Sequence, residues 1–174
     1  GSWIAYAYVN HWLSVYNNQW CNYVSGQMHE IGHNLALAHS NEGATAYADQ
    51  TGMMGYSYGS DDGPRMCFNA AKSFQLGWYS NNVQTVTLTS GMGQSYTLVG
   101  IVNYPNDTSN ENKVVLKVET GTPNDYYINF NRRTGFNSGT KEGGDQVTIV
   151  LQGGDGVNYS QSDLLAKLSA GGSY

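Results

Sequence analysis

The pattern of apolar side chains changes twice along the first part of the chain. Residues 3–9 form a β-branched and aromatic run that is typical of a strand, and residues 13–16 continue in an extended or turn-like form. From residue 24 the period changes, which predicts an amphipathic helix over 24–38 with Ser25 as its N-cap. The apolar residues that mark this helix, at spacings of three and four, are Val24, Met28, Ile31, Leu35 and Ala38.

Residues 40–66 lack a regular hydrophobic period. They are dominated by Gly, Ser, Asp, Tyr and Met, so an irregular conformation is expected there. The helical period returns over residues 68–76, which predict a second helix with Asn69 near its start and Gly77 as its stop. After its opening strand, this part of the chain is therefore expected to be helical and irregular.

Beyond residue 80 the pattern changes to short alternating runs that are separated by turn residues. The runs predict strands at residues 83–89, 96–102, 114–118, 126–130 and 147–151. Strands at this spacing indicate a small antiparallel sheet or a sandwich. Two regions are therefore expected, residues 1–80 and 81–174, and they should pack together because no linker-like segment separates them.

Composition excludes several classes of protein. The 174 residues suffice for about one domain, and 40% hydrophobic and 13% aromatic residues exclude a disordered chain. No apolar run approaches the ~18 residues of a membrane span. A net charge of −5 without any Lys/Arg cluster argues against a nucleic-acid partner, whose phosphates require a basic face.

The cysteines and two sequons bear on the compartment. Cys21 and Cys67 are the only cysteines, and they allow either one disulfide or two reduced buried thiols. Asn106 and Asn158 each begin an Asn-x-Ser/Thr sequon, which would be a glycosylation site in a secreted protein. We therefore expect a secreted, extracellular protein.

The motif His29-Glu30-x-x-His33 lies within the first predicted helix. Residues four apart share one face of a helix, so both imidazoles can bind one metal ion. Glu30 then lies beside the ion and can act as general base towards a water molecule. Only roughly three chains in a thousand of this composition would contain the motif by chance.

His39 follows His33 by six residues and is a candidate third ligand. On a continuous helix six residues rotate by about 600°, which would turn His39 away from the other two imidazoles. The helix must therefore end between His33 and His39. Three imidazoles and one water then make the open tetrahedral site of one catalytic zinc ion. The remaining histidine, His11, has no partner nearby in sequence and is interpreted as a structural or surface residue.

The pattern His29-Glu30-x-x-His33-x-x-Ala36-x-x-His39 resembles the metzincin signature H-E-x-x-H-x-x-G-x-x-H. That family has Gly at the position of Ala36, where the backbone usually becomes left-handed and ends the helix. A left-handed Ala costs roughly 1–2 kcal/mol, which is small beside the binding of imidazoles to zinc. We expect Ala36 to be tolerated at some cost in stability or metal affinity.

The string Thr51-Gly52-Met53-Met54-Gly55-Tyr56 resembles the Met-turn of the metzincins. The resemblance implies that one Met side chain lies beneath the metal as an apolar floor. Met54 is the preferred candidate because it precedes a Gly, and Met53 is the alternative. Tyr56 stands where some metzincins carry a tyrosine near the zinc, which would donate a hydrogen bond to the developing oxyanion.

Longer strings are similar to the gametolysin (algal autolysin) family of metzincins. They are MHEIGHNLALAHS at 28–40, YADQTGMMG at 47–55, CFNAAK at 67–72 and LGWY at 76–79. The match spans residues 3–80 and continues more loosely to about residue 131. It implies a secreted zinc endopeptidase that cuts extended polypeptides in proline- and hydroxyproline-rich glycoproteins of the extracellular matrix or cell wall.

The resemblance also implies a fold class. Metzincins have a helix and several strands before the zinc helix, whereas only 28 residues precede His29 here. We therefore expect an α+β chain with an N-terminally truncated, metzincin-type catalytic region, in which residues 3–9 are the edge strand that pairs with substrate. An antiparallel β-rich region would follow it.

A second interpretation is a non-catalytic extracellular protein, either an inactive relative or a module that binds glycans or the cell wall. Ala36 and the aromatic, β-rich second region permit it, but the presence of all three candidate ligands and of Glu30 favours the enzyme. Calcium is a further candidate cofactor, although solvated turn acids are the commoner explanation. The acids concerned are Asp107, Asp145 and Asp155.

Overall fold

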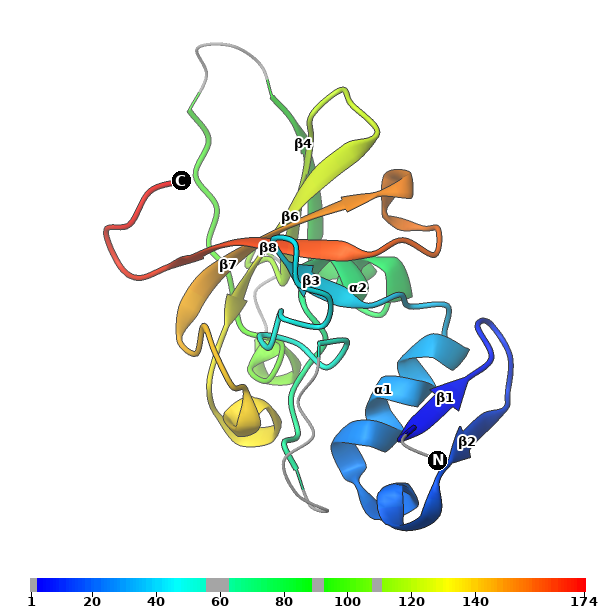
Figure 1. The fold of residues 1–174 in the computed structure, drawn as a ribbon. Coiled ribbons are helices and arrows are strands. Elements are labelled where there is room, and N and C mark those ends of the chain that lie inside the picture. The colour runs from blue at the N-terminus through cyan, green and yellow to red at the C-terminus, as the bar shows by residue number, and fades with distance from the viewer. Residues whose placement is uncertain (1–2, 56–62, 89–92, 108–110) are drawn as a thin grey trace.

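The structure is a computed structural model that describes residues 3–55, 63–88, 93–107 and 111–174. A two-stranded hairpin and an 11-residue helix lie beside a six-stranded sheet, which carries a second helix on one face (Figure 1). Short 3-10 helices occur at Asn18–Asn22, Ser80–Asn82, Tyr104–Asn106, Gly135–Gly139 and Gly154–Gly156. Within the described ranges, none of the helices combines the length and apolar character that crossing a membrane requires.

The opening hairpin consists of β1 (Ala5–Ala7) and β2 (Ser14–Tyr16), which pair antiparallel. It is fixed to the following helix by Asn34, whose side-chain amide donates to the carbonyls of Tyr8 and Leu13, at 3.1 Å each. The Ser14 hydroxyl donates to the same side chain at 2.6 Å. The predicted strand is thus shorter than expected, and it is held against the helix that carries the histidine motif.

That helix, α1 (Val24–Asn34), begins differently from the prediction. Its N-cap is Tyr23, in an extended conformation and without a capping side chain. Ser25 lies inside the first turn and is buried, so the prediction that Ser25 caps the helix is wrong. The outer face of α1 stays apolar and exposed: 50% of the Ile31 side chain and 41% of Leu35 are accessible.

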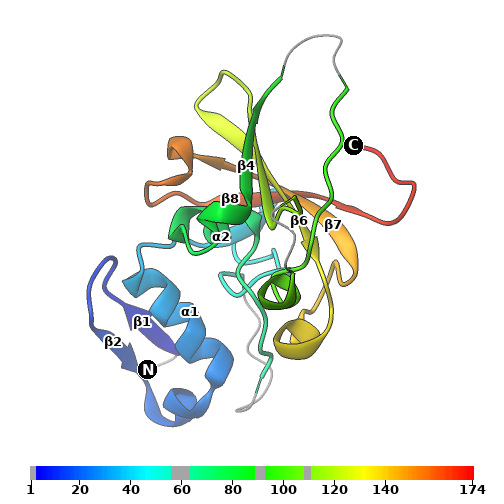
Figure 2. The same cartoon turned by 180° about the vertical axis from the view of Figure 1, so that it is seen from behind.

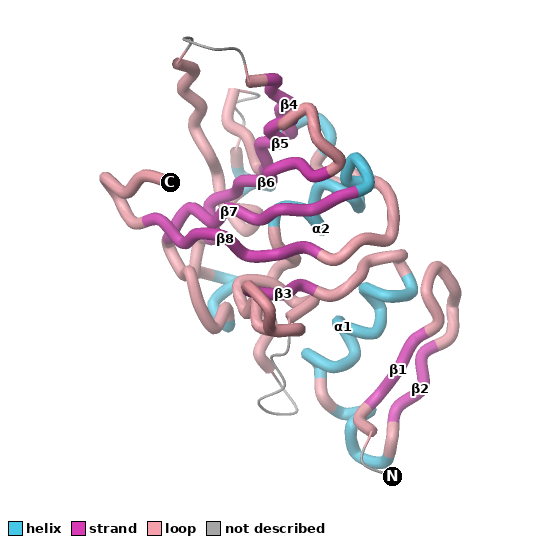
Figure 3. The backbone as a smooth tube through the Cα atoms, turned by 45° about the horizontal axis from the view of Figure 1, so that its top comes forward, coloured by secondary structure: helices cyan, strands magenta, loops and turns pink. Residues whose placement is uncertain are grey.

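The six-stranded sheet has the order β3-β8-β7-β6-β5-β4 (Figure 3). Its strands are β3 (Ser40–Glu42), β4 (Val83–Thr87), β5 (Val115–Glu119), β6 (Asn124–Asn131), β7 (Gln146–Gly153) and β8 (Ser162–Leu168). The central strands β5 to β8 pair antiparallel in chain order, whereas β3 runs parallel to β8 and β4 parallel to β5.

This arrangement corrects the expectation of an antiparallel sheet or sandwich, because the described strands beyond β2 form one mixed sheet. Parallel neighbours require a crossover, and the long connection between β4 and β5 provides one. The strand expected at residues 96–102 is absent, apart from an isolated bridge between Leu98 and Lys113. Val99 and Ile101 pack against the hydrophobic core instead. The irregular segment expected after residue 40 contains β3, so the sheet takes strands from both sides of residue 80.

The second helix, α2 (Ala70–Leu76), lies across one face of the sheet (Figure 2). The helix begins at Ala70, two residues later than predicted, but the expected start and stop signals are confirmed: the Asn69 side chain accepts from the Lys72 N–H at 3.0 Å, and Gly77 ends the helix in a left-handed conformation. Ala70 and Ala71 are fully buried because small side chains allow α2 to approach the strands closely. They belong to a core that also contains Val114, Val115, Tyr127, Val150 and Leu164.

Candidate metal centre

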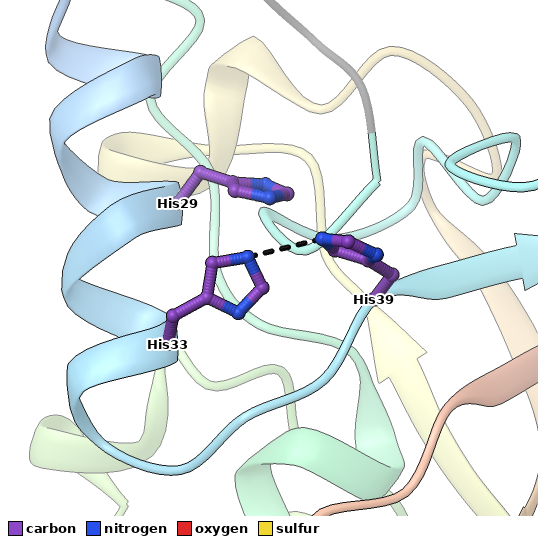
Figure 4. Close-up of side chains that lie close together, drawn as sticks. All are labelled: His29, His33 and His39. Atoms are coloured by element: carbon purple, nitrogen blue, oxygen red, sulfur yellow. Dashed lines mark hydrogen bonds between the residues drawn. The ribbon is translucent and has the colours of Figure 1, made fainter. Parts of the chain in front are cut away.

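Three histidine side chains converge between α1 and β3. His29 and His33 project from α1, and His39 lies immediately before β3 (Figure 4). Their candidate ligand atoms all lie within 4.8 Å of one another. The Nε2 atoms of His33 and His39 are 3.0 Å apart, and the rings of His29 and His39 stack with centroids 5.4 Å apart. The structure therefore brings together the three ligands predicted from the sequence.

The end of α1 makes this convergence possible. Ala36 has φ = 64°, so the predicted left-handed conformation is confirmed. The Ala36 N–H donates to the His33 carbonyl and the Leu37 N–H to the Gly32 carbonyl, both at 2.9 Å, which is the Schellman pattern of a helix terminus. The Gln75 side chain of α2 donates to the Ala36 carbonyl at 2.8 Å. The backbone reverses here and returns the third imidazole to the face of α1.

Two of the imidazoles are oriented by backbone carbonyls. His29 Nδ1 lies 3.0 Å from the Met53 carbonyl, and His33 Nδ1 lies 2.8 Å from the Leu37 carbonyl. A carbonyl only accepts, so each Nδ1 carries the hydrogen and each Nε2 carries the lone pair that can bind a metal. Burial lowers the pKa of His29 to about 3 and that of His39 to about 4. The imidazoles are therefore neutral at neutral pH, which is the form that binds a metal.

Glu30 lies beside the histidines with one oxygen unused. Its side chain is buried, and Oε2 has no hydrogen-bond partner among the described residues. Burial raises the pKa of Glu30 to about 7. A buried carboxylate without a partner is costly, so it indicates a group kept free for a ligand or for proton transfer.

Met54 lies directly beneath α1. Its side chain occupies the space that a side chain at Gly32, between the two helical histidines, would need. Met54 is fully buried, and Gly55 after it leaves no room for a side chain because the Asp49 carbonyl lies there. Met53 instead contributes its carbonyl to His29. Met54, rather than Met53, therefore packs its side chain against the helix between the two histidines.

The β-rich region holds the third ligand in place. The Ser162 N–H, at the start of β8, donates to the His39 carbonyl at 3.1 Å. The Ser40 N–H donates to the Met54 carbonyl at 3.0 Å, which ties β3 to the Met-containing turn. His39 is therefore fixed between this turn and a strand that is more than 120 residues away in sequence.

A buried polar cluster lies behind the turn. Asp49 is inaccessible to solvent, and it accepts from the Thr51 hydroxyl at 2.5 Å and from the Asn69 amide at 2.8 Å. The same Asn69 amide lies 3.1 Å from the Ser40 hydroxyl and 3.0 Å from that of Ser162. The start of α2, the turn and the β3–β8 pair are thus connected through one side chain.

A cleft of about 680 Å³ opens over the histidines. Strand β1 and its flanking residues form one wall, with the three histidines and Glu30 opposite. The residues lining it are Trp3, Ile4, Ala5, Tyr6, Ala7, Val9, His29, Glu30, His33, His39, Tyr47 and Tyr159. Sequence reasoning did not single out Tyr47 or Tyr159, because 14 tyrosines leave nothing to distinguish them in the sequence.

The other predicted residues lie elsewhere. Tyr56 is outside the described residues. His11 is exposed and stacks on Trp12, which confirms the interpretation of a surface residue. Asn106 and Asn158 are exposed.

The cysteines and the turn acids form no centre of their own. Cys21 and Cys67 are free thiols, so the disulfide that the sequence allowed is absent, and burial raises the pKa of Cys67 to about 12. Among the described residues the histidines are the one cluster able to hold a metal, and it includes none of the three turn aspartates. Asp145 is instead paired with Arg132 at 2.9 Å.

The histidine cluster fits zinc. Three neutral nitrogen donors with a free fourth direction are the ligand set of catalytic zinc, and the unpaired Glu30 oxygen suits a water beside it. The sequence profile described as Gametolysin peptidase M11 matches residues 1–138, which is most of the chain. Neither the curated proteins nor the solved structures contain a significant match. The chain therefore belongs to the gametolysin peptidase M11 family, and it is a zinc metallopeptidase.

Proposed function

We propose that this protein is a secreted endopeptidase that cuts extended, proline-rich glycoproteins of the extracellular matrix or cell wall. The observation that carries the proposal is the unpaired oxygen of Glu30, which lies with three neutral imidazoles in one cleft beside strand β1. A base, a metal-binding face and a strand edge together are what peptide hydrolysis requires.

Glu30 performs the proton transfers. Zinc bound by His29, His33 and His39 would polarise the scissile carbonyl and acidify the attacking water. Glu30 takes the proton of that water during the attack and then delivers it to the leaving amine. A carboxyl pKa of about 7 suits both roles, because the group gains and loses a proton with little cost near neutral pH.

The wall formed by β1 suits an extended peptide. Among the described strands β1 pairs only with β2, so its other edge is free to add a substrate strand. That edge runs along the cleft, where residues 3–7 all contribute to the lining. A substrate strand bound along this edge extends on both sides of the scissile bond, which is what an endopeptidase requires.

The aromatic character of the cleft favours a proline-rich substrate. Trp3 and Tyr6 on one wall and Tyr47 and Tyr159 on the other line it, and residues 3–23 contain no Lys, Arg, Asp or Glu. Prolines pack against aromatic rings and keep a chain extended without internal hydrogen bonds. The exposed Asn106 and Asn158 are consistent with glycosylation during secretion.

An aromatic ladder continues this surface beyond the cleft. Its rings run from Trp3 through Tyr6, Tyr8 and His11 to Trp12, with successive centroids 5.4–6.1 Å apart. The Trp12 side chain is 81% exposed at the hairpin tip. The ladder supports binding of a long substrate. It is also the observation that favours the alternative function, a glycan- or wall-binding module without catalysis.

Cleavage assays with zinc-loaded protein test the proposal. An uncharged proline-rich polypeptide should be cut internally, faster than a matched polypeptide with acidic residues in place of prolines, and chelation should abolish cleavage. Trp12→Ala should slow cleavage of the long polypeptide but not of a short peptide that fills only the cleft. Binding of neutral glycans that survives chelation, without any peptide cleavage, would instead support the binding module.

A further inference from the structure

The three zinc ligands are not held in the same way. The rings of His29 and His33 are fixed by the carbonyls of Met53 and Leu37, whereas the ring of His39 has no carbonyl or carboxylate partner among the described residues. Its side chain instead faces the ring of Tyr47, with centroids 4.1 Å apart and planes at 42°. This is the shortest centroid distance that any ring of the histidine cluster makes with an aromatic side chain in the described chain.

The backbone around His39 is strained on both sides. Six non-glycine residues of the described chain have positive φ, and four of them are Asn or Asp, which tolerate that conformation. The other two are Ala36, at 64°, and Tyr47, at 62°, and they flank His39 in sequence. A bulky residue with positive φ is a true outlier, and such strain persists where the surrounding structure requires the side chain in one place.

Local contacts hold Tyr47 in this conformation. Its N–H donates to the Asn41 side chain at 3.2 Å, one residue beyond the start of β3. Its carbonyl lies against Gly55, so that a side chain there would contact it. The Tyr47 hydroxyl makes no hydrogen bond to a described residue, so it is the ring, and not the hydroxyl, that is positioned against His39.

We propose that Tyr47 is the positioning residue of the third zinc ligand. Its ring packs on the His39 imidazole and keeps Nε2 directed towards the other two histidines, as the carbonyls do for His29 and His33. The inference rests on the zinc site of the proposed function and not on its substrate. Partners that orient a ligand typically change metal affinity 10- to 100-fold when they are removed.

Zinc affinity and the visible spectrum of the Co²⁺-substituted protein, both measured without substrate, test the inference. Tyr47→Ala should weaken zinc binding about 10- to 100-fold and change the Co²⁺ bands, which report ligand geometry. Tyr47→Phe keeps the ring and should retain both properties. Tyr159→Ala is the control, since Tyr159 lines the same cleft and makes no ring contact with His39 among the described residues.

Because Tyr47→Ala keeps the strained backbone, Tyr47→Asn provides a second variant that removes the ring and suits a positive φ. Both variants should weaken zinc binding. Wild-type affinity and spectrum in either folded variant would overturn the inference, as would a Tyr47→Phe variant that binds zinc as weakly as Tyr47→Ala. Zinc binding is measured without substrate, so a failure of the proposed peptidase function would be seen separately, in the cleavage assay.

Discussion

The two α-helices in the described part of the chain are built by opposite rules. Helix α2 begins with a capping Asn69, ends at a left-handed Gly77, and buries an Ala pair against the sheet. Helix α1 has no capping side chain, ends at a left-handed Ala36, and buries histidines and Glu30 while Ile31 stays half exposed. Both helices contact the same Met-containing turn, but α1 packs against the hairpin and α2 against the six-stranded sheet.

The difference follows from what each helix supports. In α2 the cap, the terminus and the buried Ala pair agree with local preferences, as in an element whose role is structural, although α2 also buries Lys72. In α1 the capping, the terminus and the polarity of the buried face all depart from those preferences. The departures coincide with the metal ligands and the base, which is where local rules are expected to fail.

The variant with the largest expected effect tests whether Glu30 of α1 acts in catalysis and not in folding or metal binding. Glu30→Gln should lower kcat about 10²- to 10⁴-fold, because an amide cannot take a proton from water. Zinc content and thermal stability should stay close to the wild type, since Glu30 is not among the clustered ligands. Metal analysis together with a cleavage assay measures both. Retained hydrolysis would show that another group is the base.

The next effect compares the starts of the two helices. Asn69→Ala should lower the free energy of unfolding by about 2–4 kcal/mol, because it removes a cap and leaves Oδ2 of the buried Asp49 without its donor. Ser25→Ala in the first turn of α1 should change it by less than about 0.5 kcal/mol, or increase it, because Ser25 Oγ is buried without a partner. Urea denaturation measures both. Equal losses of stability in the two variants would show that the starts of the two helices do not differ in this way.

The sequence allowed α2 to be predicted well because its signals are local. Asn69 acts as the cap and Gly77 as the stop, each within one helical turn. The start of α1 was predicted wrongly at Ser25 because Tyr23 adopts the extended N-cap conformation without any side-chain signal. Its end was predicted from chemistry, because a third ligand at His39 demands a break that propensity does not show.

The sheet shows the limit of local signals more clearly. Strand β8 escaped prediction because Asp163 and Lys167 interrupt its apolar pattern, and β3 because three residues are too short to show one. Their parallel pairing joins segments about 120 residues apart, which no local pattern encodes. The roles of Tyr47 and Asp49 depend on the same long-range assembly, so only the structure singles them out.

A pH-dependent effect follows from the buried cation of α2. Burial lowers the pKa of Lys72 to about 7, although Asp49 opposes the shift, and its amine donates to Gln152 and to the Ser160 carbonyl at 2.6 Å each. Above pH 7 the folded lysine is neutral while the unfolded one stays protonated up to about 10.4. Folding then releases a proton, so the free energy of unfolding rises with pH in this window.

Lys72→Met removes this contribution. The difference in the free energy of unfolding between wild type and Lys72→Met should therefore rise by up to about 1.4 kcal/mol for each pH unit between pH 7 and 10. Below pH 7 the difference should be constant. Urea denaturation at several pH values measures this difference. If the free energies of unfolding of the two proteins change with pH in parallel over the whole range, Lys72 keeps its charge inside the protein.

The smallest expected effect comes from exchanging the residue types, Ala and Gly, that end the two helices. Ala36→Gly relieves a left-handed Ala worth roughly 1–2 kcal/mol, but it adds freedom to the unfolded chain, so a net gain of about 1 kcal/mol is expected. Gly77→Ala should lose about the same, and cleanly, because a side chain at Gly77 would meet nothing within 4 Å. Thermal and urea unfolding of the apo proteins should show shifts of opposite sign.

If Ala36→Gly also tightens zinc binding, the strain at the end of α1 acts on the third ligand. If it stabilises the fold without changing zinc affinity, the packing around His39 fixes the ligand independently of the helix terminus. A loss of stability in Ala36→Gly would mean that Ala36 is not strained, and that the end of α1 fits its local preferences as well as the end of α2 does.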